Sequence, residues 1–434
     1  MTGRKSEGNS AQTDRLGQMA AEASRELAGT RRVRLAAEMK NLARRMLGRK
    51  TEEKDLFYWP AGMLALGLAE YGAEDGIQAV CEHVRLFNKK GGKLLYPDDA
   101  LMGAALIRLP AESEELSRAV EQVYAMVCGT DRDELGSILY RPGRGHTEIL
   151  ADGAGMTAFF LAKYACSLLQ KLPEDTVKRT ELQKKAIEAL ELAMAQLYNF
   201  SSFSKDPESG LLWHCYEAKE DGGLVRKGLI GWGRAMGWYL MGLSETACTM
   251  KVLGLEEEAA EEETEEADTL PDLLERYCEA VFSFQRENGL LPWNLTELVQ
   301  RSDVFTSVTS QKLKDALLDP ENSEDGTVHH ILTADSLQTD TSASAMTGYA
   351  VLRAVECGLL DQGKFMDRLS RLKKGLEEQT DSCGVLGGSL AECVGFGVQP
   401  QRFGNYPWGQ GAALAFLARY QRFTETAHKN GETN

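Results

Sequence analysis

Apolar residues recur along this chain in two alternating kinds of helical segment. In the first kind they stand three or four positions apart with charged residues between them, which is typical of an amphipathic helix with one buried face. Leu116, Val120, Val123 and Val127 form one such face. The amphipathic segments cover about residues 34–48, 74–87, 113–128, 180–199, 269–287 and 362–379.

The second kind of segment is apolar on nearly all sides and rich in Gly, Ala and Met. A helix that is apolar all round must be buried on all sides. Buried helices that alternate with one-sided helices predict an all-α (α/α)6 barrel, in which an inner ring of buried helices lies inside an outer ring of amphipathic ones. The polar or aromatic openings of the inner helices fall at Trp59, Asp98, Asp152, Gly231, Thr341 and Tyr406.

Around this barrel the sequence predicts a few additional features. The barrel is expected to be a single domain over residues 31–425, preceded by a disordered or loosely ordered segment over 1–30. Gly, Pro and Ser gather around 138–150, 203–230 and 290–335, which indicates loops with short β-hairpins.

Composition and charge narrow the range of partners. Hydrophobic residues make up 43% of the 434 positions, which is enough for a sizeable core. The net charge of −16 argues against nonspecific nucleic-acid binding. Nine acidic residues and no basic ones lie between Glu256 and Asp268, so a solvated surface insertion is expected at about 255–268.

The cysteines and the N-terminal residues indicate the cellular compartment in which the protein is expected. Nine cysteines are spread singly without a Cys-x-x-Cys pair, which favours a reducing compartment over a disulfide framework. The polar stretch from Met1 to Arg32 has no apolar core typical of a signal peptide, and no transmembrane segment is evident. These features predict a cytoplasmic protein without a membrane partner. The sequence does not indicate an oligomeric state.

The openings of the inner helices are the candidate functional site. All inner helices of such a barrel begin at the same face, so their polar and aromatic residues are expected to converge on one small-molecule pocket. Tryptophan stacks on the apolar faces of sugar rings, although each one also suits a core position. The openings contribute the candidates Trp59, Trp232, Trp238, Trp408, Thr341 and Ser342.

Two sets of carboxylates are candidates for acid chemistry. Asp152 stands in an apolar run at a helix start, where it fits either an N-cap or an acid whose pKa is set by burial and the helix dipole. Asp98 and Asp99 fit caps as well. If one of them faces Asp152, the pKa of one carboxyl group rises and that group keeps a proton near neutral pH.

His214 and Arg234 complete the candidate site. His214 lies among aromatic residues before the fourth inner helix, where it fits a structural role or a proton relay. Arg234 is an unusual cation in an apolar helix and is expected to pair with a carboxylate of the protein or of a ligand. His329 and His330 lack partners at metal-ligand spacing, so neither a metal nor a cofactor is predicted.

Three motifs, taken in order, resemble the unsaturated glucuronyl and rhamnogalacturonyl hydrolases of glycoside hydrolase families 88 and 105. They are Asp152-Gly-x-x-Met156, then Trp232-Gly-Arg-Ala-Met-Gly-Trp238, then Thr341-Ser-Ala-Ser-Ala-Met346. The second motif is the most specific and is closer to family 105, the rhamnogalacturonyl side. The likeness extends from about Trp59 to Tyr420.

The resemblance implies an (α/α)6 barrel that hydrolyses lyase-generated oligosaccharides ending in a 4,5-unsaturated uronic acid. By position, Asp152 matches the catalytic acid/base and Asp98 the assisting aspartate, with Asp99 as the alternative in that register. His214 matches a contact to the sugar and to the catalytic carboxyl, and Arg234 and Trp238 match substrate-binding positions.

The sequence also departs from the family pattern. Ala154-Gly155 follows the Asp-Gly pair where the family often has a bulky residue, and the loops over 255–268 and 294–339 are long and polar. These differences leave the preferred sugar open. Two other functions also fit the barrel: another sugar-active enzyme, such as an inverting glycosidase or an epimerase, and a noncatalytic sugar-binding protein.

Overall fold

The computed structural model describes most of the chain. The residues that it describes are 3–31, 39, 43–44, 46–47, 55–110, 113–141, 147–207, 209–219, 223–255, 268–295, 338–392 and 402–431. The predicted acidic insertion and most of the region 290–335 lie outside these residues, as does most of the predicted helix at 34–48.

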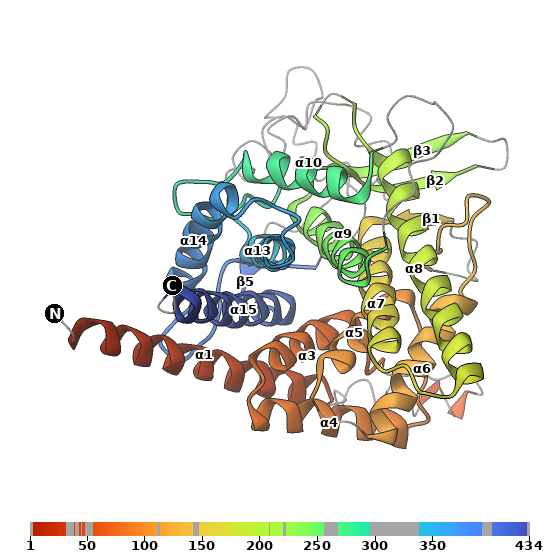
Figure 1. The fold of residues 1–434 in the computed structure, drawn as a ribbon, viewed down its shortest axis with the longest axis horizontal. Helices are drawn as coiled ribbons and strands as arrows, with labels where there is room; N and C mark the ends of the chain where they lie inside the picture. Colours follow the sequence, from red (N-terminus) through yellow and green to blue (C-terminus); the bar gives the residue numbers. More distant parts are fainter. Residues whose placement is uncertain are drawn as a thin grey trace.

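The inner ring predicted from the apolar segments is present. Each of its helices packs on the next, and the last packs on the first, so that the ring is closed as Figure 1 shows. This arrangement confirms the (α/α)6 barrel. The inner helices are α3 (Trp59–Tyr71), α5 (Ala100–Arg108), α7 (Ala151–Gln170), α9 (Gly233–Leu253), α13 (Thr341–Glu356) and α15 (Pro407–Gly431).

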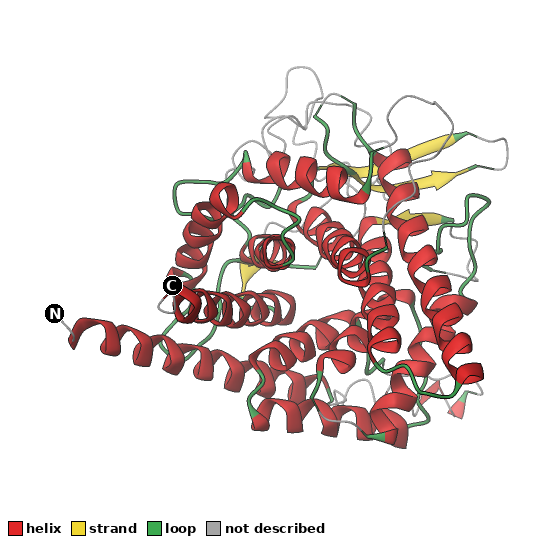
Figure 2. Cartoon of the chain, viewed as in Figure 1, coloured by secondary structure: helices red, strands yellow, loops and turns green. Residues whose placement is uncertain are grey.

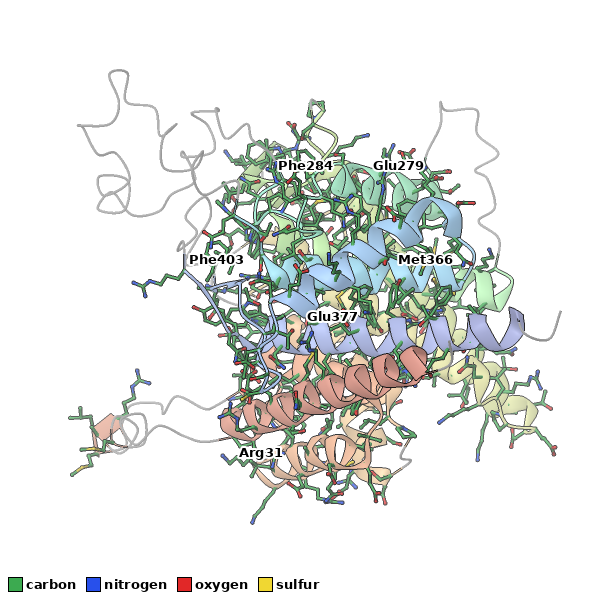
Figure 3. The ribbon with its side chains drawn as sticks, turned by 90° about the vertical axis from the view of Figure 1, so that its left-hand side faces the viewer. Arg31, Glu279, Phe284, Met366, Glu377 and Phe403 are labelled. Atoms are coloured by element: carbon green, nitrogen blue, oxygen red, sulfur yellow. The ribbon has the colours of Figure 1, made fainter. Side chains whose placement is uncertain are left out.

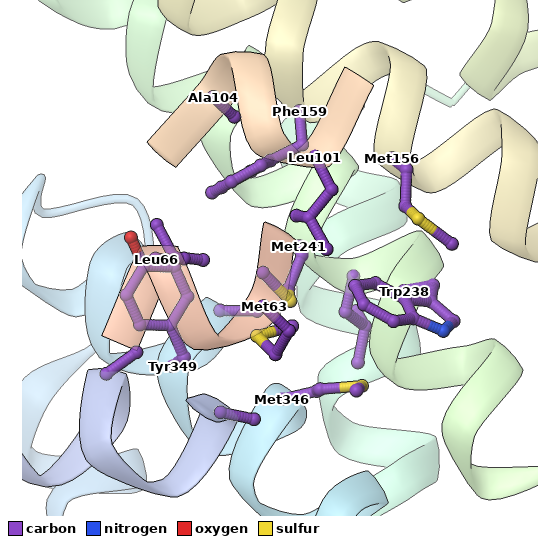
Figure 4. Close-up of a cluster of buried hydrophobic side chains, with 14 of the residues drawn as sticks. Met63, Leu66, Leu101, Ala104, Met156, Phe159, Trp238, Met241, Met346 and Tyr349 are labelled. Atoms are coloured by element: carbon purple, nitrogen blue, oxygen red, sulfur yellow. The ribbon is translucent and has the colours of Figure 1, made fainter. Parts of the chain in front are cut away.

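Glycines allow the inner helices to approach closely. A Cβ atom on Gly155 of α7 would lie 2.2 Å from the carbonyl oxygen of Trp238 on α9, and one on Gly67 would lie 2.5 Å from the carbonyl oxygen of Gly411. Flexible Met side chains fill the remaining space between the helices. Figure 4 shows Met241 and other methionines gathered there, with Trp238 beside them.

The outer ring agrees with the amphipathic segments. Helix starts are marked by side chains that accept hydrogen bonds from free backbone N–H groups, as Ser113 does from Leu116 and Asp361 does from Lys364. The outer helices predicted from the sequence and present in the described residues are α4 (Glu74–Lys89), α6 (Glu114–Gly129), α8 (Thr176–Ser204), α10 (Leu270–Phe282) and α14 (Gln362–Glu378).

The remaining helix of the outer ring comes from the first 30 residues, for which the sequence predicts a disordered or loosely ordered segment. Helix α1 (Gly3–Thr30) packs on α3, α4 and α15, and Figure 3 shows it beside α15. It buries Leu16, Met19, Ala23 and Leu27, which recur every three or four residues. From Leu16 to Leu27 this helix is therefore packed into the barrel. Because most residues of this segment are polar, its single narrow stripe of apolar residues does not stand out in the sequence.

The strands lie in the loops between the helices, as Figure 2 shows. Strands β1 (Glu148–Leu150), β2 (Trp213–Ala218) and β3 (Leu224–Ile230) form an antiparallel sheet in that order, and β4 (Ser389–Leu390) pairs with β5 (Phe403–Gly404). The first sheet confirms the strands expected within 138–150 and 203–230. No described helix is both long and apolar enough to cross a membrane.

Candidate active site

Asp152 is placed by the junction of β1 and α7. The N-cap of α7 is Leu150, which makes no side-chain cap hydrogen bond, so Asp152 stands inside the first turn and is not the cap. Its Oδ2 atom lies 3.0 Å from Nε2 of His214. The carboxyl side chain is 14% exposed. The N-cap interpretation is therefore wrong, because the helix begins at Ala151 with Leu150 as its N-cap, and the Asp152 carboxyl group lies next to His214.

His214 comes from β2 and is held in place by its neighbours. Its ring is 2% exposed and meets the Trp232 ring edge-on with 4.4 Å between centroids. Gly228, on the paired strand β3, has φ +85°, and a Cβ atom there would lie 2.9 Å from Cβ of His214. A glycine at this position thus leaves room for the imidazole beside Asp152.

Asp98 is the second carboxyl group of the site. It lies in the 3-10 turn η1 (Pro97–Asp99) before α5, is 2% exposed, and accepts a hydrogen bond of 3.0 Å from the Tyr140 hydroxyl. Burial raises the pKa of Asp98 to about 7, and the negative charges of Asp55 and Asp152 act in the same direction. A large fraction of Asp98 is therefore protonated near neutral pH.

Asp99 has a different role from Asp98. Its Oδ2 atom accepts a hydrogen bond of 2.7 Å from the backbone N–H of Leu95, so it fastens the loop that leads into η1. Burial raises the pKa of Asp99, and so does the neighbouring Asp55. The geometry thus favours Asp98 over Asp99 as the partner of Asp152.

Arg234 is buried, and none of the described residues offers it a carboxylate partner. It is 1% exposed, and its Nη1 and Nη2 atoms donate to the carbonyl oxygens of Leu390 at 2.8 Å and Ala391 at 3.2 Å. Its guanidinium also lies 4.7 Å from the Trp232 ring centroid and 5.4 Å from that of Trp408. No acidic side chain among the described residues forms an ion pair with it. A buried guanidinium without a carboxylate partner is a candidate for binding an anionic ligand.

Three of the four predicted tryptophans contact one another, and the Arg234 guanidinium, which lies over both Trp408 and Trp232, links the fourth to them. The Trp59 ring lies 5.9 Å from that of Trp238 and 5.0 Å from that of Trp408. Trp408 donates its indole N–H to the Leu390 carbonyl at 3.0 Å. The indole N–H groups of Trp232 and Trp238 are buried and have no acceptor among the described residues. The group thus combines apolar ring faces with two free donors, a pairing that suits a sugar.

Residues 37–311 match a family model described as Glycosyl Hydrolase Family 88. The chain belongs to glycosyl hydrolase family 88. The matched region contains both candidate carboxylates as well as His214, Arg234 and Trp238. It follows that this protein is a glycoside hydrolase. No curated protein matches the sequence.

Solved structures with the same fold come from families 88 and 105. A possible member of family 105 from Klebsiella pneumoniae is 16% identical with a TM-score of 0.64, over 94% of this chain and 93% of that one. A family 105 glycoside hydrolase from C. acetobutylicum is 18% identical (TM-score 0.59; 84% and 94% covered). An unsaturated glucuronyl hydrolase from Bacillus sp. GL1 is 16% identical (TM-score 0.58; 86% and 89% covered). At these identities the likeness concerns the fold.

Thr341 and Ser342, two of the predicted substrate-binding residues, form hydrogen bonds within the protein itself. The Thr341 hydroxyl donates to the Gly387 carbonyl at 2.8 Å, and the Ser342 hydroxyl donates to Asp340 at 2.7 Å. Asp340 also accepts from the backbone N–H of Leu390 at 3.0 Å. These bonds hold β4 against the start of α13, where the carbonyl of Leu390 supports Arg234. A sugar contact by Thr341 or Ser342 stays a prediction.

Sequence reasoning missed Tyr140, Asp55 and the carbonyl groups of Leu390 and Ala391. Tyr140 lies near both candidate carboxylates, because its hydroxyl donates to Asp98 and because a Cβ atom on Gly153, the residue after Asp152, would lie 2.9 Å from its ring. Tyr140 is an isolated aromatic residue in a loop. Backbone carbonyls carry no sequence signal, so pattern analysis had nothing from which to identify any of these groups.

Proposed function

We propose that this hydrolase releases a terminal 4,5-unsaturated uronic acid from oligosaccharides that a polysaccharide lyase has produced. The observation that carries the proposal is a pair of carboxyl groups, Asp152 and Asp98, together with a buried Arg234 that has no carboxylate partner among the described residues. Trp232 links the two parts, because its ring contacts both His214 and the Arg234 guanidinium. Acid chemistry needs the carboxyl groups, and a uronic acid supplies the missing anion. Arg234 binds carboxylates well because its planar fork donates two parallel hydrogen bonds.

The proposed reaction is hydration of a vinyl ether. Asp152 delivers a proton to C4 of the unsaturated sugar, and positive charge develops at C5 and the ring oxygen. Water adds at C5 while Asp152 takes up the proton that the water loses. The resulting hemiketal opens and the linked sugar is released. The reaction forms no covalent sugar-enzyme intermediate, so the spacing rule for paired glycosidase carboxylates does not apply.

The neighbours of Asp152 have distinct roles in this proposal. His214, at 3.0 Å, orients the carboxyl group and exchanges a proton with it. Asp98 holds a proton near neutral pH, so the site does not accumulate two negative charges beside an anionic substrate. Tyr140 positions Asp98 through its hydroxyl hydrogen bond. The tryptophans stack on the sugar rings.

For the substrate class we propose a rhamnogalacturonan or pectin fragment. The support is the Trp232–Trp238 motif, which is closer to the rhamnogalacturonyl side of the resemblance. The Bacillus sp. GL1 protein, which has the same fold, is named for degradation of glycosaminoglycan. A glycosaminoglycan fragment is therefore the direct competitor to test.

A panel of lyase-generated disaccharides tests both proposals. Unsaturated uronides absorb ultraviolet light and the hydrated product does not, so turnover appears as a loss of absorbance. We expect the rhamnogalacturonan disaccharide to react fastest and a saturated analogue to give no signal. Sugar release with the absorbance retained would instead identify an ordinary glycosidase. A third result, binding without turnover by both the wild type and Asp152→Asn, would identify a sugar-binding protein.

A further inference from the structure

Two cysteines meet at the end of the barrel opposite the candidate active site. Cys248 lies near the end of α9, and Cys357 follows the last residue of α13. Cys248 stands 14 residues beyond Arg234 on the same helix, which places it on the order of 20 Å away along the helix axis. These thiols therefore belong to a separate feature of the fold.

Arg353 contacts both thiols. Its Nη1 atom donates to the Cys357 sulfur at 2.6 Å, and its carbonyl oxygen accepts from the Cys248 thiol at 3.5 Å. The same carbonyl oxygen accepts from the backbone N–H of Cys357 at 3.2 Å, so the two cysteines are immediate neighbours. The guanidinium is fixed by Glu245 at 3.2 Å, and Glu245 in turn pairs with Lys163 at 3.1 Å. The sulfur pair is thus held in a rigid network of buried charges.

The two cysteines are chemically unequal. The neighbouring Cys248 thiol lowers the pKa of Cys357 to about 7, and the Arg353 charge adds to the effect against the opposing influence of burial. Burial raises the pKa of Cys248. Cys357 is partly exposed and Cys248 is buried. An accessible thiolate beside a protected thiol is the usual arrangement of a reactive and a resolving cysteine.

We propose that Cys357 and Cys248 form a peroxide-sensitive dithiol that closes to an intramolecular disulfide. The Cys357 thiolate attacks one peroxide oxygen, the O–O bond breaks, and hydroxide leaves to give a sulfenic acid on Cys357. The Cys248 sulfur then attacks the Cys357 sulfur, the S–O bond breaks, and hydroxide leaves with the Cys248 proton as water. Overall, two thiols and one peroxide give one disulfide and two waters, and a dithiol reductant reverses the change.

Other cysteines provide controls for this assignment. Cys166 on α7 also lies near Arg353 and Cys357, but burial raises its pKa. Cys383 is exposed and has no cysteine partner among the described residues. Cys166 is therefore the competing partner for Cys357, and Cys383 reports what peroxide does to an unpaired surface thiol.

The test uses the full chain, reduced and then treated with hydrogen peroxide. Remaining thiols are alkylated, and the protein is digested without reductant for mass spectrometry. We expect a cross-linked peptide pair containing residues 248 and 357, about 2 Da lighter than the two reduced peptides together. The pair should disappear on reduction. Cys383→Ser and Cys166→Ser should leave the yield unchanged, and Cys357→Ser should abolish the cross-link.

A further variant separates the two steps. In Cys248→Ser the sulfenic acid on Cys357 has no resolving thiol, so a dione probe for sulfenic acids should label Cys357 several-fold more than in the wild type. Two results would overturn the proposal in the wild-type chain itself, irrespective of how any variant folds. One is a cross-link from Cys357 to Cys166 in place of Cys248. The other is oxidation of Cys357 no faster than that of Cys383 and without a disulfide.

Discussion

Nε2 of His214 lies 3.0 Å from Oδ2 of Asp152, so strand β2 meets the first turn of α7 at the candidate catalytic carboxyl group. The contact joins an outer β-hairpin to an inner helix of the barrel. Asp152 lies inside the first turn of the helix, and its side chain contacts the imidazole instead of capping the helix. The orientation of Asp152 therefore depends on the hairpin, and several variants can test that dependence.

Asp152→Asn tests the catalytic role directly. An amide cannot deliver or take up the proton, while its size preserves most contacts in the site. We expect turnover of an unsaturated disaccharide to fall on the order of a hundredfold or more, with near-normal binding. Absorbance kinetics and calorimetric binding measure the two effects. Full activity of the variant would remove Asp152 from the mechanism.

Gly228→Ala tests whether the hairpin positions His214. A Cβ atom at residue 228 would lie 2.9 Å from Cβ of His214, so the imidazole must shift away from Asp152. We expect kcat to fall on the order of tenfold or more, because small displacements of catalytic groups are costly.

Gly210→Ala is the matched control for this variant. Gly210 has φ +70°, close to the +85° of Gly228, but a Cβ atom there would meet nothing within 4 Å. Both variants should lose about 1 kcal/mol of stability from backbone strain. Only Gly228→Ala should lose activity, and equal kinetics for the two would contradict the positioning role.

The buried Asp98 predicts a pH dependence of stability. Its pKa is raised from near 4 to about 7 on folding, so the folded chain binds this proton more tightly than the unfolded chain. The stabilisation is fully present below about pH 4 and is lost as the pH rises through about 7. Asp98→Asn removes the titration, so its stability advantage over the wild type should grow across this window to roughly 4 kcal/mol.

Urea unfolding at several pH values between 4 and 8.5 measures the difference. Asp361→Asn is the control, because Asp361 is an exposed N-cap and Asn caps a helix equally well. Its difference from the wild type should stay nearly flat. A flat difference for Asp98→Asn as well would show that Asp98 titrates normally.

Arg234→Ala should mainly weaken substrate binding. The guanidinium has no carboxylate partner among the described residues, so its removal deprives a uronic acid of two charge-assisted hydrogen bonds. We expect KM to rise roughly ten- to a hundredfold with a smaller change in kcat. Circular dichroism must show a folded protein. Unfolding would favour a structural role for the bonds to Leu390 and Ala391, and unchanged kinetics would exclude the ligand role.

The buried Glu70 is expected to stabilise the fold, although it is not part of the candidate active site. It is 1% exposed, accepts from the Tyr349 hydroxyl at 2.8 Å and pairs with Arg419 at 3.4 Å. Glu70→Gln removes the fully buried anion of this cluster and leaves Arg419 with Glu356 as its remaining carboxylate partner. It should lower the free energy of unfolding by about 3–5 kcal/mol at pH 7. Glu82→Gln, in an exposed pair with Arg31, should cost less than about 1 kcal/mol. Equal losses in urea unfolding would contradict the prediction.

The sequence by itself determined the barrel and most of the residues that gather at its mouth. Helical period and all-round apolarity show which segments are inside, since a fully apolar helix has no stable place at the surface. The same criteria did not identify α1 as a barrel helix. Its buried residues Leu16, Met19, Ala23 and Leu27 form a stripe that is too narrow to stand out in a polar segment.

Only the tertiary structure decided what each polar group touches. The carbonyl of Leu390 that holds Arg234 lies 156 residues away in the chain, and Tyr140 reaches Asp98 across 42 residues. It also decided that Asp98 meets Tyr140, that Asp99 binds the backbone of Leu95 and that Asp152 meets His214. Periodicity reports which face of an element is buried, whereas these contacts depend on how separate elements are placed in space, which no local pattern encodes.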